Sequence, residues 1–176
     1  MSNDNIKTVL FFDHNWTQIE RLIRIFANSI SDSKLRVVML SDRLSSAVEG
    51  NLEVINILDV PQRQTLLELQ SKYTTSLHRA LVPERAFYDY SSFRKSQCYS
   101  SLSDEEIEQK ITPYINALDF VIREKVDVMI DWFPDNFISS VSQAICANYA
   151  KRCNILLPLY WWSDGGLVID RADMTS

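Results

Sequence analysis

The chain has 176 residues, of which 46% are hydrophobic and 23% are charged, and its formal net charge is −5 at pH 7. This composition is typical of a globular protein and excludes a disordered chain. The acidic balance argues against a general nucleic-acid binder, which would normally carry a basic face. The length matches one ordinary domain, so residues 1–176 are predicted to fold as a single unit.

The sequence predicts neither a targeting segment nor a membrane span. Its start lacks the basic residues and the apolar run of a signal peptide. No apolar stretch approaches the ~18 residues that are needed to cross a bilayer. The 3 cysteines include no C-x-x-C pair, which favours reduced thiols, with Cys146 buried as a small apolar residue. We therefore expect the protein in the cytoplasm.

Five short apolar runs, rich in β-branched residues, predict strands. The runs are residues 8–12, 35–40, 52–58, 126–130 and 155–160. The first, second and fourth runs are almost continuously apolar, which is typical of strands that are covered on both faces.

Helical patterns fall between the first three runs and after them. Thr17–Glu20 fits a capping box and opens an apolar stripe that ends at Ile30. Residues 62–73 predict a helix that begins close to Pro61, and residues 42–50 predict one or two helical turns.

The second half of the chain predicts two longer helices. A capping box at Ser103–Glu106 is the clearest helix start in the sequence. That helix is expected to kink or restart at Thr112–Pro113, because proline lacks a backbone N–H, and to run on to Glu124. The last helix is predicted over Phe137–Lys151.

Strands that alternate with helices imply right-handed crossovers and a parallel sheet. The expected fold class is therefore α/β, with an open, Rossmann-like parallel sheet of about five strands flanked by helices. The expected strand order is 3-2-1-4-5, with the switch point between the first and fourth strands. Residues 74–102 interrupt the alternation and are interpreted as a long excursion or lid.

In open parallel sheets, ligands bind at the carboxyl ends of the strands, beside the switch point. The turns after the first, fourth and fifth strands contain all 4 tryptophans and one of the 2 histidines, a clustering that core packing does not require. The candidate site residues there are Asp13, His14, Asn15, Trp16, Asp131, Trp132, Asp135, Asn136, Tyr160 and Trp161. Two simpler interpretations stay open: aromatic side chains at strand ends often cap the core, and Asp or Asn before a helix is usually its N-cap.

The sequence lacks the motifs of several common sites. Its 3 glycines fall well below the roughly twelve that average usage would give. Neither a G-x-G-x-x-G turn nor a G-x-x-x-x-G-K-[ST] loop is present, which argues against a dinucleotide or nucleoside triphosphate site of either kind. A G-x-S-x-G elbow and an H-E-x-x-H pair are also missing, and we predict no cofactor and no metal.

Residues 74–102 combine many aromatic side chains with several basic ones, among them Arg85. Guanidinium groups beside aromatic faces suit an anionic or sugar-bearing ligand, or peripheral contact with an anionic membrane surface. On this interpretation Arg85 is a candidate substrate-binding residue. An amphipathic segment that packs on the sheet with its charges in water explains the same pattern without a ligand, and both interpretations stay open.

Three stretches carry a resemblance to a known family. The first is residues 7–13. The second and third are residues 114–131 and 144–157, in each of which a predicted helix leads into an apolar run, KVDVMID in one and RCNILL in the other. Their succession resembles the N-terminal Rossmann-like half of GT-B-type glycosyltransferases that assemble bacterial capsule and other surface polysaccharides. The similarity spans most of the chain.

The resemblance implies that the chain binds a sugar or glycan acceptor and takes part in surface polysaccharide biosynthesis. It also implies that a C-terminal half, which grips the nucleotide sugar, is missing, so that this sequence is the N-terminal part of a longer protein and is not active alone. A base supplied from this half is expected among His14, Asp13 and Asp131.

Two other functions stay open. The first is a stand-alone interaction or regulatory domain without catalysis, which would bind a protein through its aromatic excursion. The second is a flavodoxin- or receiver-like module. It is disfavoured because its site needs a Gly- or Ser/Thr-rich phosphate loop or an acidic triad with a lysine, and the sequence contains neither.

Overall fold

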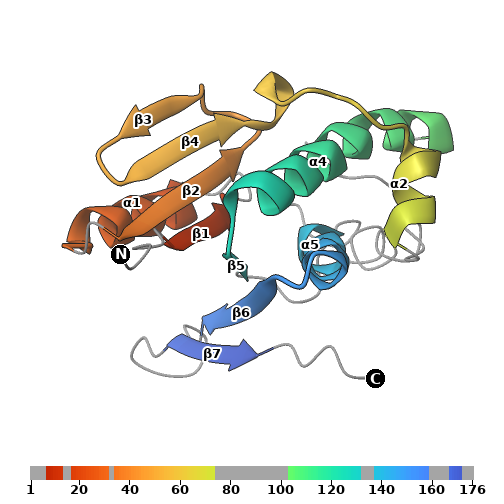
Figure 1. The fold of residues 1–176 in the computed structure, drawn as a ribbon. Helices are drawn as coiled ribbons and strands as arrows, with labels where there is room; N and C mark the ends of the chain where they lie inside the picture. Colours follow the sequence, from red (N-terminus) through yellow and green to blue (C-terminus); the bar gives the residue numbers. More distant parts are fainter. Residues whose placement is uncertain are drawn as a thin grey trace, which may run out of the picture.

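A computed structural model describes residues 7–13, 17–31, 34–73, 103–131, 137–158 and 167–171. The fold is α/β, with helices flanking an open and mostly parallel sheet (Figure 1). Within these ranges, none of the helices combines the length and the apolar character that a membrane span needs. The predicted excursion over residues 74–102 lies outside the described residues.

Five parallel strands form the centre of the sheet, and they lie in the predicted order. From one side to the other they are β4 (Leu52–Asn56), β2 (Leu35–Ser41), β1 (Lys7–Phe12), β5 (Val128–Asp131) and β6 (Arg152–Pro158). β1 pairs in parallel with both β2 and β5. The switch point therefore lies between β1 and β5, as predicted.

Two antiparallel edge strands were not predicted, so the complete order is β3-β4-β2-β1-β5-β6-β7. β3 (Ala47–Glu49) pairs with β4, and β7 (Leu167–Arg171) pairs with β6. The prediction of helical turns over residues 42–50 is wrong, because a tight turn at Gly50 and Asn51 folds β3 back onto β4 as a hairpin. Gly50 has a φ of 60°, which the first central residue of such a turn favours and which glycine adopts at little cost.

Helices cover both faces of the sheet. They are α1 (Thr17–Ser29), α2 (Leu66–Tyr73), α4 (Asp104–Lys125) and α5 (Phe137–Asn148), with a short 3-10 turn, η1 (Ile57–Asp59), after β4. Leu10 and Phe12 of β1 pack in one hydrophobic cluster with α2, α4 and α5, whereas Val9 and Phe11 pack in another with α1. We call the two sides the α4 face and the α1 face; they can be followed in Figure 1.

α4 runs without interruption through Pro113 over its 22 residues. The predicted restart with Thr112 as a cap is wrong, since the Thr112 hydroxyl donates to the Glu108 carbonyl at 2.6 Å, inside the helix. Ile111 and Ile115 flank the proline and are buried in the core. Tertiary packing on both sides of Pro113 thus offsets the backbone hydrogen bond that proline cannot make.

α2 begins at Leu66, later than predicted. Thr65 caps it: its hydroxyl accepts from the Glu68 N–H at 3.3 Å, and the Glu68 carboxylate accepts from the Thr65 N–H at 2.7 Å. The N–H groups of residues 63 and 64 instead donate to Asn116 of α4 at 3.3 and 3.1 Å. These contacts hold the chain outside the helix up to Thr65.

The ends of the other helices have recognisable caps. The capping box predicted at Ser103–Glu106 is confirmed, with both of its hydrogen bonds present. α5 ends before the predicted residue, because Ala150 adopts a left-handed conformation with a φ of 52°. The Ala150 N–H donates to Ala147 at 3.1 Å and the Lys151 N–H donates to Cys146 at 2.8 Å, a Schellman motif with alanine in the place usually taken by glycine.

Candidate functional site

The predicted site lies at the carboxyl ends of the parallel strands, which we call the carboxyl edge. Of its candidate residues the structure describes Asp13 and Asp131, and it places them at the ends of the neighbouring strands β1 and β5. The other candidates lie outside the described residues, and their place at this edge stays a prediction. They are His14, Asn15, Trp16, Arg85, Trp132, Asp135, Asn136, Tyr160 and Trp161.

Asp13 directly follows β1 and is completely buried. Ser41, the last residue of β2, donates its hydroxyl to Asp13 Oδ2 at 2.8 Å. Arg43 Nε lies 3.1 Å from the same carboxylate oxygen. The Asp13 N–H donates to the Leu40 carbonyl at 3.1 Å, which extends the pairing of β1 with β2 beyond the strand end. These partners offset the cost of removing a carboxylate from water.

The turn after β2 is tied to α1. The Ser41 hydroxyl accepts from the N–H groups of Arg43 and Leu44 at 3.2 and 3.0 Å, which fixes the turn. The Arg43 guanidinium also donates to Glu20 of α1. Burial tends to raise the pKa of Glu20, but hydrogen bonds from Arg24 and Arg43 outweigh this effect and leave the pKa below its ordinary value. Glu20 therefore remains charged and holds Arg43 in place.

The same turn also contacts the α4 face. Asp42 accepts a hydrogen bond from the hydroxyl of Tyr114 in α4. The Tyr114 ring packs against Phe12, with the two ring centroids 5.9 Å apart. Consecutive residues, Asp42 and Arg43, thus bond helices on opposite faces, which fixes the turn from both sides.

Asp131 is the last residue of β5 and is completely buried. Its Oδ2 accepts a hydrogen bond from the hydroxyl of Ser139, in the first turn of α5. α5 packs on the α4 face, whereas the Arg43 partner of Asp13 reaches Glu20 on the α1 face. The structure therefore does not bring the two candidate carboxylates together. Although their strands are neighbours, Asp13 and Asp131 bond elements on opposite faces of the sheet.

The two described thiols lie toward the other end of the sheet, since Cys153 is near the start of β6 and Cys146 is near the end of α5. Cys146 and Cys153 are both buried and unbridged, which confirms the predicted burial of Cys146. A hydrogen bond with Cys146, together with burial, raises the pKa of the Cys153 thiol. A thiol that resists ionisation is a poor nucleophile and a poor metal ligand. In the part of the chain that the structure describes, no group of three or more His, Cys, Asp or Glu side chains is placed to hold a metal ion.

A second polar cluster, which was not predicted, lies between α2, α4 and α5. Asp119 of α4 is buried, and its Oδ1 accepts from Lys72 Nζ at 2.9 Å, from the Tyr149 hydroxyl at 2.8 Å and from the Tyr73 hydroxyl. Burial tends to raise the pKa of Asp119, but hydrogen bonds from Tyr73, Lys72 and Tyr149 outweigh it and lower the pKa. Lys72 Nζ also lies 5.2 Å from the centroid of each tyrosine ring. The members bond one another, which indicates a structural role.

Sequence reasoning missed the partners of the candidate residues. Ser41 ends a strand and Ser139 lies in the first turn of a helix, and serine in such places often bonds a neighbouring backbone or carboxylate group. That signal was present and could have been used. Glu20 and Tyr114 carried no comparable signal, because each meets the turn after β2 only through the tertiary fold.

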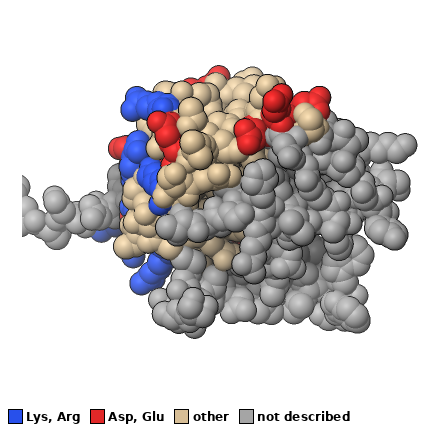
Figure 2. All heavy atoms as spheres, turned by 90° about the vertical axis from the view of Figure 1, so that its right-hand side faces the viewer, with Lys and Arg blue, Asp and Glu red and all other residues tan. Residues whose placement is uncertain are grey.

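The described surface has no continuous basic face on the side where α2 lies. Figure 2 shows acidic side chains along the top of this side and basic side chains along its left flank, with uncharged residues between them. This part of the described surface therefore carries charges of both signs, and acidic side chains also lie among the basic ones on the left flank.

A search of protein-family models finds no match for this chain, and a search of curated proteins finds none either. The function must therefore be argued from the fold and from the contacts at the carboxyl edge.

Proposed function

We propose that this chain is the acceptor-binding, Rossmann-like half of a GT-B-type glycosyltransferase that builds capsule or another bacterial surface polysaccharide. The acceptor, a sugar or glycan, binds at the carboxyl edge, and a separate C-terminal domain binds the nucleotide sugar. One observation carries the proposal: completely buried carboxylates, Asp13 and Asp131, end the two strands that flank the switch point. Ligands of open parallel sheets bind at this place, and ordered polar groups there support the loops that contact them.

On this proposal the two described carboxylates position the site. Asp13 holds the turn after β2 through Ser41 and Arg43, and Asp131 holds the first turn of α5 through Ser139. The base is then His14, which directly follows Asp13 in the sequence. The tryptophans of the three turns supply flat apolar faces on which a sugar ring stacks.

Saturation-transfer NMR on the 176-residue chain tests acceptor binding, with oligosaccharides of bacterial surface polysaccharides as probes. We expect saturation of the sugar ring protons, and we expect Asp131→Asn to weaken it because a neutral amide accepts from the Ser139 hydroxyl more weakly than the carboxylate does. Glu105→Gln is the matched control, since Glu105 is an exposed carboxylate in the first turn of α4. An absence of saturation for every oligosaccharide, or equal saturation in Asp131→Asn, would contradict the proposal.

A second function is favoured by the contacts themselves. Asp13 and Asp131 bond Ser41 and Ser139 and lie toward opposite faces, so they do not form an acid–base pair. This arrangement suits a stand-alone Rossmann-like interaction or regulatory domain without catalysis. Such a domain binds a protein partner and no sugar, so the same NMR experiment separates the two functions: saturation of ring protons supports the first, and its absence supports the second.

A further inference from the structure

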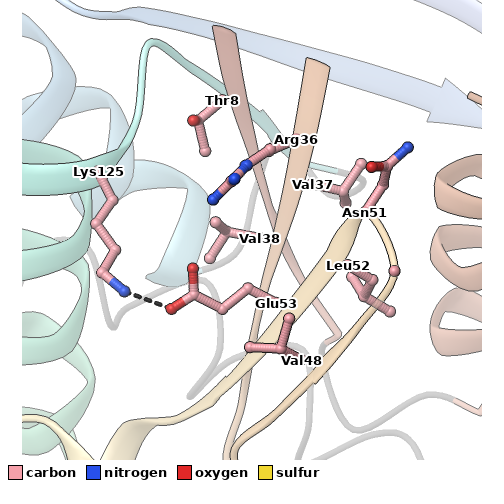
Figure 3. A pocket seen from close by; sticks show the side chains of 10 residues that line it. Thr8, Arg36, Val37, Val38, Val48, Asn51, Leu52, Glu53 and Lys125 are labelled. Carbon is pink, nitrogen blue, oxygen red and sulfur yellow. Dashed lines mark hydrogen bonds and ion pairs between the residues drawn. The ribbon is translucent and has the colours of Figure 1, made fainter. Parts of the chain in front are cut away.

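The opposite end of the sheet, which we call the amino edge, contains a cavity of about 390 Å³. It lies where β1, β2 and β4 begin, beside the last turn of α4 (Figure 3). Pockets for small ligands usually span about 300–1,000 Å³, so this cavity has room for a compact molecule. It is separate from the carboxyl edge, because it lies at the other end of the same parallel strands.

Strand pairing explains which polar side chains meet there. Thr8 of β1 is the partner of Arg36 in β2, and Val38 of β2 is the partner of Glu53 in β4. Because side chains alternate along a strand, Thr8, Arg36 and Glu53 all project toward the α4 face. Figure 3 shows Arg36 reaching from β2, and Lys125 from the end of α4, into the space between them.

The charges of this cavity do not balance. Lys125 forms an ion pair with Glu53. Arg36 is exposed, and its guanidinium has no hydrogen-bond or ion-pair partner among the residues that the structure describes. Arg24 and Arg43, by contrast, are each paired with carboxylates. The cavity therefore carries one uncompensated positive charge, although the whole chain has a net charge of −5.

We propose that the amino-edge cavity binds the phosphate or carboxylate group of a small molecule. Arg36 is the main ligand, because a guanidinium offers two parallel N–H donors that match the oxygens of either group. The Thr8 hydroxyl adds a neutral donor, whereas Lys125 adds no net charge because it is paired with Glu53. The carbonyl end of α4 opposes an anion, and Lys125 is already paired with Glu53, so binding depends on Arg36. The side chains of Val38 and Val48 form an apolar wall for the rest of the molecule, since Val48 of β3 is the partner of Glu53.

Titration with inorganic phosphate, followed by amide NMR of the full chain at constant ionic strength, tests this site. We expect saturable shifts at the amides of Arg36, Gly50, Asn51 and Lys125, and we expect sodium chloride to produce none. Arg36→Gln should weaken phosphate binding by about tenfold or more, because a hydrogen-bonded charge pair is lost. Arg21→Gln is the control, since Arg21 is an exposed arginine of α1 outside the cavity lining. The Arg21→Gln chain should bind phosphate as tightly as the unchanged chain does.

Malonate, titrated in the same way, distinguishes a carboxylate ligand from a phosphate ligand. Binding of either anion that depends on Arg36 supports the site, and the tighter anion identifies the preferred group. The site is overturned if neither anion binds, or if Arg36→Gln binds as tightly as Arg21→Gln. Unchanged amide shifts outside the cavity show that the Arg36→Gln chain is folded. None of these results bears on acceptor binding at the carboxyl edge, so this proposal and the proposed function can fail separately.

Discussion

At the carboxyl edge of the sheet, Asp13 and Asp131 are completely buried and accept hydrogen bonds from Ser41 and Ser139. At the amino edge, Arg36 is exposed beside a cavity and has no partner among the described residues. Both edges contain charged groups, but the buried ones are already engaged in internal contacts. Of these three described groups, the exposed guanidinium of Arg36 is the one whose hydrogen-bonding capacity is not used by an internal contact that the structure describes.

The two edges differ in what a charged side chain contributes: a buried one contributes to stability, and an exposed one contributes to ligand binding. A buried carboxylate must be matched by donors, because desolvation without them costs several kcal/mol. Its removal should therefore reduce stability, whatever ligand the protein binds. An exposed and unpaired cation contributes little to stability, and its removal should mainly reduce binding. The following substitutions test this contrast, from the largest expected loss of stability to the smallest.

Asp13→Ala should lower the free energy of unfolding by about 3 kcal/mol, because it leaves the buried Ser41 hydroxyl and the Arg43 guanidinium without their carboxylate. Urea denaturation at pH 7 measures this loss. Asp13→Asn is the matched control: it keeps an oxygen that accepts from Ser41 and should lose clearly less stability. If Asp13→Ala changes the unfolding free energy by less than about 0.5 kcal/mol, the carboxyl edge is not held by Asp13.

Asp119→Asn should cost about 2 kcal/mol at pH 7, because Lys72 and the two tyrosines lose a charged acceptor. The pKa of Asp119 is lowered in the folded chain, so its stabilising effect is complete above the unfolded pKa of about 3.9. The effect is lost as the pH falls through the lower, folded pKa. Urea denaturation at a series of pH values from 7 downward measures the difference in unfolding free energy between the unchanged chain and Asp119→Asn. This difference should shrink under acid conditions. A difference that stays constant or widens would contradict this cause.

Ser139→Ala should cost about 1 kcal/mol, because Asp131 loses a buried donor. Ser142→Ala provides a close control. Ser142 is also a completely buried serine of α5, but its hydroxyl has no hydrogen-bond partner among the described residues. Its removal should be neutral or slightly stabilising, since a buried polar group without a partner is unfavourable. Equal losses in the two variants, measured by urea denaturation, would show that the hydrogen bond to Asp131 contributes nothing.

The centre of the sheet was predictable from the sequence because its strands are short apolar runs separated by helical patterns. The edge strands were not predictable from the sequence, and β3 shows why. β3 has three residues, all of them exposed, so it has neither an apolar run nor an inward face to detect. The end of α5 was missed for a local reason: Ala150 takes the left-handed conformation at a position where glycine is the usual signal.

For the two described candidate residues, the position at a strand end was predictable but the contacts were not. The chain order of strands and turns placed Asp13 and Asp131 at the ends of neighbouring strands, and the structure confirms that place. The face toward which each carboxylate lies depends on strand register and on which helix packs nearby. The Asp119 cluster depends in the same way on the packing of three helices, since Lys72 and Asp119 are far apart in the sequence. Local patterns contain no information on such contacts.

Arg36→Gln should change the free energy of unfolding by less than about 0.5 kcal/mol in chloride buffer, because the exposed guanidinium has no partner to lose. Adding phosphate should then produce a difference in the free energy of unfolding between the unchanged chain and Arg36→Gln. A ligand that binds only the folded state adds stability that grows with its concentration relative to its Kd, so the unchanged chain should gain stability while Arg36→Gln gains less. Arg21→Gln should gain as much as the unchanged chain, since it keeps the cavity intact. If Arg36→Gln instead loses more than about 1 kcal/mol without phosphate, Arg36 is part of the internal structure, and the contrast between the two edges is wrong.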